Sequence, residues 1–173
     1  MAERDLPKVE AAGSSPVSRS INDRRPADML VPMSVRGEQV DPWRFTARFG
    51  VRQYELDVLG HVNNAVYLNW VEQVAIDHVE ALGFGRAWSI EHGGAWVVRE
   101  HHATYHRPVE YGDAVLVTTM PQEIAGVRGI RRTEIHRESD GALTTEVTTH
   151  WIWVRASDGR PARIPPQLLE AWR

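Results

Sequence analysis

The sequence of 173 residues contains no cysteine. This absence excludes disulfide bonds, thiolate metal sites and a cysteine nucleophile. Long hydrophobic runs are also missing: the longest, at residues 95–98 and 114–117, are far shorter than the roughly 20 residues that span a bilayer. The first residues lack the apolar core of a signal peptide. We therefore expect a soluble, cytoplasmic protein that does not enter a membrane.

Neither sign of charge dominates the chain. Twenty Lys and Arg residues stand against 23 Asp and Glu residues, which gives a formal net charge of −3. Such a balance creates no general attraction for nucleic acid or for an anionic membrane, so we expect neither as a partner. The composition, 42% hydrophobic and 25% charged, is typical of a globular domain with a core.

The first 40 residues differ from the rest because they carry four prolines, a small polar run and no apolar period. A segment of this kind buries too little apolar surface to offset the entropy lost on ordering. We predict that residues 1–40 form a flexible N-terminal tail and that residues 41–173 form a single domain.

Periodicity within residues 41–173 predicts one long helix and several strands. Residues 43–54 alternate apolar and polar side chains, as strands do. Residues 64–82 carry an apolar stripe with helical spacing, with Asn63 or Asn64 as the N-cap and Gly83 as the stop. Four more strands, separated by short turns, and a short closing helix are predicted at residues 94–107, 114–124, 127–137, 143–153 and 165–172.

This order of elements indicates the architecture. Strands joined by short turns pair antiparallel, and a helix with a wide apolar face needs a sheet to cover it. We predict an α+β fold in which an antiparallel sheet of about five strands wraps around one long central helix.

The segment that leads into the helix has the residues of a catalytic site. Asp57 follows the first strand, Gly60 permits a tight loop, His61 comes next, and the helix begins at once. A helix N-terminus offers free N–H groups and a positive dipole end, both of which stabilise an oxyanion. A base beside such a site is what the attack of water on an ester-like carbonyl requires.

Two motifs carry a family resemblance. The stretch D-x-x-G-H-V-N-N-A-x-Y-x-x-W, from Asp57 to Trp70, resembles the signature of the 4-hydroxybenzoyl-CoA thioesterase family of hotdog enzymes. That family includes many bacterial acyl-CoA thioesterases and is related to acyl-acyl carrier protein thioesterases. The run Y-x-x-P-x-x-x-G-D, from Tyr105 to Asp113, is similar to the family's turn after its second strand. The resemblance covers about residues 43–156.

This resemblance implies a hotdog fold and hydrolysis of an acyl thioester, carried by CoA or by acyl carrier protein, without a cofactor. It implies that Asp57 is the catalytic general base or nucleophile. The backbone N–H of Asn64 matches the amide that polarises the thioester carbonyl, and Gly60 matches the loop glycine. His61 matches a histidine that some members use. Plant acyl carrier protein enzymes have Asn at the position of Leu59, so their full Asp-Asn-His arrangement is not transferred.

Further candidates for substrate binding have a simpler alternative role. Asn63 and Tyr67 belong to the first motif, and their alternatives are a helix cap and core packing. Arg128, Arg131 and Arg132, together with Arg99 and Arg107, form the notable basic cluster, which suits CoA phosphates or the acidic face of a carrier protein. An ordinary charged strand face is the alternative.

Two other interpretations of polar residues are set aside at this stage. His101 and His102 point to opposite faces of a strand, and His106 lies about 13 Å from His102, too far for one zinc ion, so no metal site is predicted. Glu72 lies where another branch of hotdog thioesterases places its acidic catalyst. With Asp57 present, we interpret Glu72 as a solvated or interface residue.

The resemblance also implies a homodimer or homotetramer with sites at the subunit interface. Two rival functions remain. A hotdog hydratase or dehydratase is disfavoured because its usual active-site loops are absent from the sequence. A non-catalytic hotdog protein that binds acyl-CoA is disfavoured by the presence of Asp57. The sequence leaves open the acyl group, the carrier, and whether Asp57 acts as base or nucleophile.

Overall fold

The computed structural model describes residues 40–173, to which all structural statements refer. The predicted flexible tail lies outside the described residues, apart from Val40. The elements in chain order are β1 (Phe45–Gly50), the single turn η1 (Gln53–Glu55), α1 (Asn64–Ala81), α2 (Arg86–Glu91), β2 (Gly94–Tyr105), β3 (Ala114–Ala125), β4 (Arg128–Arg137), β5 (Leu143–Arg155) and α3 (Pro166–Glu170).

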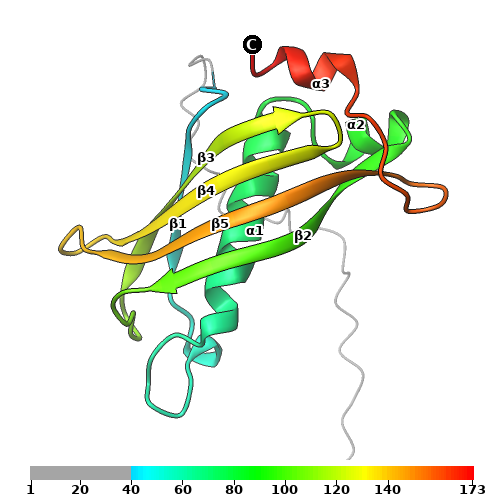
Figure 1. Cartoon of the computed structure of the whole chain (residues 1–173). Coiled ribbons are helices and arrows are strands. Elements are labelled where there is room, and N and C mark those ends of the chain that lie inside the picture. Colours follow the sequence, from blue (N-terminus) through cyan, green and yellow to red (C-terminus); the bar gives the residue numbers. More distant parts are fainter. Residues whose placement is uncertain (1–39) are drawn as a thin grey trace, which may run out of the picture. The chain divides into compact units, whose positions relative to one another are not determined.

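The five strands form one sheet in the order β1-β3-β4-β5-β2, and every neighbouring pair is antiparallel. α1 lies against one face of this sheet, as Figure 1 shows. The predicted α+β fold, an antiparallel sheet of five strands around one long helix, is confirmed. β2 and β1 are the edge strands.

The alternation of side chains along the strands builds the core between sheet and helix. Over residues 129–135 of β4 and 145–153 of β5 the odd-numbered residues are buried and their even-numbered neighbours are more exposed. Val71 and Val74 of α1 are buried in one cluster with Val117, Ile135 and Val147 of the sheet. Burying a side chain of this size contributes about 1.5–3 kcal/mol, so this contact fixes the position of α1 on the sheet.

Both ends of α1 are set by local chemistry. Asn63, rather than Asn64, is the N-cap: its side-chain Oδ1 accepts a hydrogen bond from the N–H of Ala65 at 3.0 Å. Beyond the last turn, Gly83 adopts φ +83°, a conformation that few other residues tolerate. The predicted stop at Gly83 is confirmed.

Two local features differ from the sequence prediction. β1 ends at Gly50, because the chain then tightens into η1, where the buried Glu55 carboxylate accepts a hydrogen bond from the N–H of Arg52. The short helix α2 was not predicted, since six residues are too few to show a helical period. Within residues 40–173, no helix is long and apolar enough to cross a membrane.

Candidate active site at the start of the central helix

A tight loop between η1 and α1 holds Asp57. The N–H of Asp57 donates to the carbonyl of His61 at 2.7 Å, and the N–H of Gly60 donates to the carbonyl of Asp57 at 3.1 Å. Gly60 has φ +82°, so the loop depends on a residue without a Cβ there. Leu56 and Val62 pair across the base of the loop. The loop is therefore anchored at both ends.

The same loop orients the Asp57 carboxylate. Its Oδ1 accepts hydrogen bonds from the N–H of Leu59 at 2.8 Å and from the N–H of His61 at 3.1 Å. Asp57 is exposed. Since the backbone holds one carboxylate oxygen, Oδ2 is the oxygen that remains available to accept a proton.

The first turn of α1 supplies a backbone donor beside this carboxylate. The N–H of Ala65 bonds to the side chain of Asn63, and the N–H of Val66 bonds to its carbonyl. The N–H of Asn64 has no acceptor among the described residues. It belongs to the free donors at the positive end of the helix dipole, where a developing oxyanion is stabilised.

A cavity of about 240 Å³ lies over this carboxylate and this helix start. Its lining combines the first motif with the end of β2 and the following turn: Asp57, His61, Val62, Asn64, Tyr67, Tyr105, His106, Arg107 and Pro108. Four of the predicted site residues thus meet at one cavity. Gly60 and Asn63 do not line it; they are the glycine of the Asp57 loop and the cap of α1.

The second motif contacts the first. The N–H of Val62 donates to the carbonyl of Val109 at 2.8 Å, and the backbones of His61 and Glu110 form an isolated antiparallel β-bridge. The Tyr105 hydroxyl donates to the carbonyl oxygen of Asn64 at 3.1 Å. The turn after β2 therefore forms one wall of the site, which explains why both motifs occur in one chain.

Comparison with known proteins identifies the family. The sequence profile of the thioesterase-like superfamily matches residues 51–172. The chain belongs to this superfamily. The family and the enzyme class that the two motifs predicted are thereby confirmed.

Individual relatives and solved structures extend the comparison. Long-chain acyl-CoA thioesterase FadM of Escherichia coli is 29% identical over 120 residues, which cover 69% of this chain and 90% of that protein. Palmitoyl-acyl carrier protein thioesterase of Gossypium hirsutum is 25% identical over 152 residues, 84% of this chain but 37% of that protein. The DHNA-CoA thioesterase structure from Staphylococcus aureus superposes with a TM-score of 0.70 at 25% identity, covering 75% of this chain and 88% of that one.

Two tyrosines line the smaller cavity, of which the sequence prediction named only Tyr67 as a site residue. Tyr67 is buried, and its ring packs edge-on against Tyr105 with centroids 5.4 Å apart. Burial raises the pKa of Tyr67, although a hydrogen bond from the backbone of Val109 opposes this shift, and burial also raises the pKa of Tyr105. Both hydroxyls stay protonated at neutral pH and therefore act as donors, not bases. The signal for Tyr105 was its place at the head of the second motif.

The predicted basic cluster does not form, because consecutive strand positions face opposite sides of the sheet. Arg131 is buried against α1, whereas Arg128 and Arg132 are exposed. The two exposed side chains are also paired with acids. Arg128 lies 3.5 Å from Glu123, and Arg132 forms ion pairs with carboxylates on its own and the neighbouring strand. The three side chains therefore do not share one face of the sheet.

A second cavity of about 650 Å³ lies beyond the first, between the C-terminal half of α1, α2 and the sheet. Its lining is mostly apolar and includes Ala75, Ile76, Trp96 and Trp151. Glu72, the acidic residue that another hotdog branch uses, lines this cavity and not the one that holds Asp57. The cavity that holds Asp57 and the large apolar cavity are thus separate along α1.

Proposed function

We propose that this protein hydrolyses acyl-CoA thioesters to the free acid and CoA at the 240 Å³ cavity. The observation that carries the proposal is the convergence of the Asp57 carboxylate and the free N–H of Asn64 on that cavity. The name of the FadM relative, a long-chain acyl-CoA thioesterase, supports the same substrate class.

In this proposal Asp57 is the general base. Oδ1 is held by two backbone N–H groups, and Oδ2 accepts a proton from a water molecule that attacks the thioester carbon. The negative charge that develops on the carbonyl oxygen is stabilised by the N–H of Asn64 and the helix dipole. The tetrahedral intermediate then expels the CoA thiolate, a good leaving group that needs no strong acid.

The other residues around the cavity orient the reactants. His61, which lines the cavity beside Asp57, orients the attacking water. Tyr105 holds the helix start by donating to the Asn64 carbonyl. Arg107 is exposed at the rim of the cavity and is our candidate for a CoA phosphate, in place of the paired Arg128 and Arg132.

The second cavity suits the acyl chain. A volume of about 650 Å³ lies in the ordinary range of ligand sites, and its apolar walls favour a long aliphatic chain over a single aromatic ring. Asn64 and Glu72 are eight residues apart on α1, which places the edge of this cavity about 12 Å from the thioester site. We propose that a long acyl chain runs along α1 into it.

The working unit in this proposal is a homodimer formed through β2. This strand is 12 residues long and lies at the edge of the sheet, so its outer N–H and C=O groups face no strand among residues 40–173. Such an edge invites pairing with another chain. Pairing through β2 places both cavities near the interface, because Tyr105 and Trp96 of β2 line them. Size-exclusion chromatography with light scattering tests the assembly.

The decisive experiment is thiol release from acyl-CoAs of increasing chain length by the wild type and by Asp57→Asn. Asparagine keeps an Oδ1 acceptor for Leu59 and His61, so the loop survives while the base is lost. We expect kcat to fall by about 10²–10⁴. Asp77→Asn, a change on α1 outside both cavity linings, is the matched control. Equal turnover by Asp57→Asn and the wild type rejects the assigned base, and no turnover of any acyl-CoA by the wild type rejects the substrate class.

A further inference from the structure

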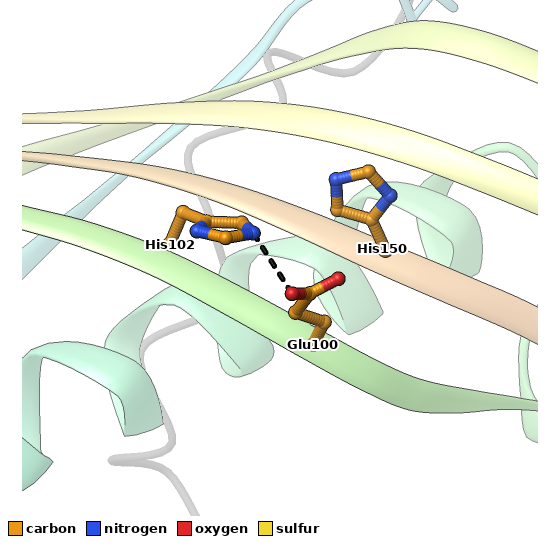
Figure 2. A group of neighbouring side chains, drawn as sticks. All are labelled: Glu100, His102 and His150. Atoms are coloured by element: carbon orange, nitrogen blue, oxygen red, sulfur yellow. Dashed lines mark ion pairs between the residues drawn. The ribbon is translucent and has the colours of Figure 1, made fainter.

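Three potential metal ligands meet on the face of the sheet that is turned away from α1, as Figure 2 shows. None of them lines either cavity. Glu100 and His102 are two residues apart on β2, so their side chains point to the same side. His150 on β5 is the direct cross-strand partner of Glu100. The register of the sheet therefore brings together residues that are 50 positions apart in the chain.

One ligand atom from each of these side chains lies within 4.8 Å of the other two. Nε2 of His102 is 3.0 Å from a carboxylate oxygen of Glu100, and the rings of His102 and His150 stand edge-to-face with centroids 6.0 Å apart. Imidazole nitrogens together with a carboxylate oxygen are the ligands that zinc and its first-row neighbours bind. We propose that Glu100, His102 and His150 form a binding site for a divalent transition-metal ion such as Zn²⁺.

The spacing of the three groups requires only small movements to accept the ion. Bonds of about 2.0–2.2 Å in a tetrahedron put neighbouring ligand atoms roughly 3.3 Å apart. The side chains of His102 and Glu100 are 65% and 51% exposed, so rotation about their side-chain bonds meets little resistance. The existing ion pair between them is of the exposed kind, which contributes little and is easily exchanged for a metal ion. Water completes the coordination on the solvent side.

The other described histidines belong to no such set of three ligands, and several contact other groups instead. His78 is buried with both ring nitrogens in hydrogen bonds, and His101 on the opposite face of β2 contacts Thr149. His106 pairs with Glu146. Within residues 40–173, the group on β2 and β5 is the one set of three ligands close enough for a single ion. The sequence analysis considered only His101, His102 and His106, because His150 is brought in by strand pairing and not by local spacing.

The surrounding charges favour a cation at this position. Thr148 and Ile130, the cross-strand partners of His102 and His150, are uncharged. Two arginines on β4 lie two positions from Ile130, one on each side. Both are already paired with acids, Arg132 with Glu134 and Glu146, and Arg128 with Glu123. An ion held by all three ligands ties the edge strand β2 to β5. Its effect is therefore on the stability of the sheet, and it is independent of the proposed hydrolysis.

The test uses the full chain without an affinity tag, since a histidine tag would itself bind metal. Isothermal titration with Zn²⁺ should give one ion per chain, Co²⁺ should give visible d–d absorption, and the melting temperature should rise with added zinc. His102→Ala, His150→Ala and Glu100→Gln should each weaken zinc binding at least tenfold, because removing even an outer partner of a ligand costs about 10–100-fold. His136→Ala, on β4 and outside the group, is the matched control and should bind as the wild type does.

Melting temperatures without metal distinguish a lost ligand from a damaged fold. The three ligand variants should melt within a few degrees of the wild type in the presence of a chelator and should lose only the zinc-dependent rise. The proposal is overturned if the wild type binds no Zn²⁺ at about 100 µM, or if His150→Ala and His102→Ala bind it as tightly as the wild type does.

Discussion

The guanidinium of Arg131 donates a hydrogen bond to Nδ1 of His78 over 3.0 Å, in the interior between β4 and α1. The other ring nitrogen, Nε2, lies 2.9 Å from the carbonyl oxygen of Asp41. Nδ1 therefore accepts while Nε2 carries the proton and donates, which defines a neutral imidazole. Burial and the positive charge of Arg131 lower the pKa of His78 to about 4, and burial lowers the pKa of Arg131 to about 10.

This pair makes stability depend on pH in acid. Unfolding returns the pKa of His78 from about 4 to its ordinary value of 6.5. Between these values the unfolded chain binds more protons than the folded chain, so stability is complete above pH 6.5 and is lost as the pH falls toward 4. We expect His78 to account for a loss of up to about 3 kcal/mol over this window, measured by urea unfolding at successive pH values.

Two variants separate the pH dependence due to His78 from that due to the Asp and Glu carboxylates. His78→Gln keeps an acceptor for Arg131 and a donor for the Asp41 carbonyl but cannot titrate, so its stability should vary less between pH 6.5 and 4. His136→Gln, a change on β4, should keep the slope of the wild type. Identical slopes in the wild type and His78→Gln would contradict the assignment.

The sequence predicted what depends on local pattern. The apolar stripe of α1, the alternation of β5 and the glycine at position 83 each act through neighbours a few residues away, and each prediction is confirmed. For the candidate site, the two motifs identified Asp57 and Asn64, which the structure brings to one cavity.

The features that the sequence missed depend on which strands pair and which face a side chain takes. Arg131 is buried beside α1 while its neighbour Arg132 is exposed, a difference of one position on β4. Glu100 and His150 meet only because β2 pairs with β5 in one register. Alternation separates neighbours such as Arg131 and Arg132, but packing across the whole sheet decides which of them faces the core and which register the strands take.

The cap of α1 should influence both stability and turnover. Asn63→Ala removes the acceptor of the Ala65 N–H, and we expect the free energy of unfolding to fall by about 1 kcal/mol. Because the N–H that we propose for the oxyanion is that of the next residue, Asn64, kcat should fall as well. Asn63→Ser retains a cap and should recover most of both properties. Chemical denaturation and steady-state kinetics provide the measurements. A normal kcat in Asn63→Ala would show that the oxyanion site does not depend on the cap.

The arginines should differ in their effect on substrate affinity. Arg107 is exposed at the rim of the smaller cavity, so Arg107→Gln should raise KM for acyl-CoA by about tenfold, as expected for one lost charge-assisted hydrogen bond. Arg132→Gln should change KM less than twofold, since its charge is already engaged by Glu134 and Glu146. The ratio of KM values between acyl-CoA and acyl-pantetheine, which lacks the nucleotide phosphates, is the measurement. A larger effect of Arg132→Gln than of Arg107→Gln would indicate that CoA binds on the exposed face of β4 and not at Arg107.

The larger cavity should determine which acyl chains are accepted. Ala75 faces this cavity from α1 and is only 6% exposed, so the ring introduced by Ala75→Phe must occupy space that we assign to the distal acyl chain. Long-chain acyl-CoAs should therefore lose kcat/KM, while short chains, which end before the cavity, should keep it. Each methylene buried in an apolar site contributes about 0.8 kcal/mol, so losing three or four of them lowers kcat/KM by roughly 10²-fold. Ala81→Phe, at the exposed end of the same helix, is the control for helix substitution. An equal loss for all chain lengths in Ala75→Phe would indicate a general packing defect, and an unchanged profile would place the acyl chain outside this cavity.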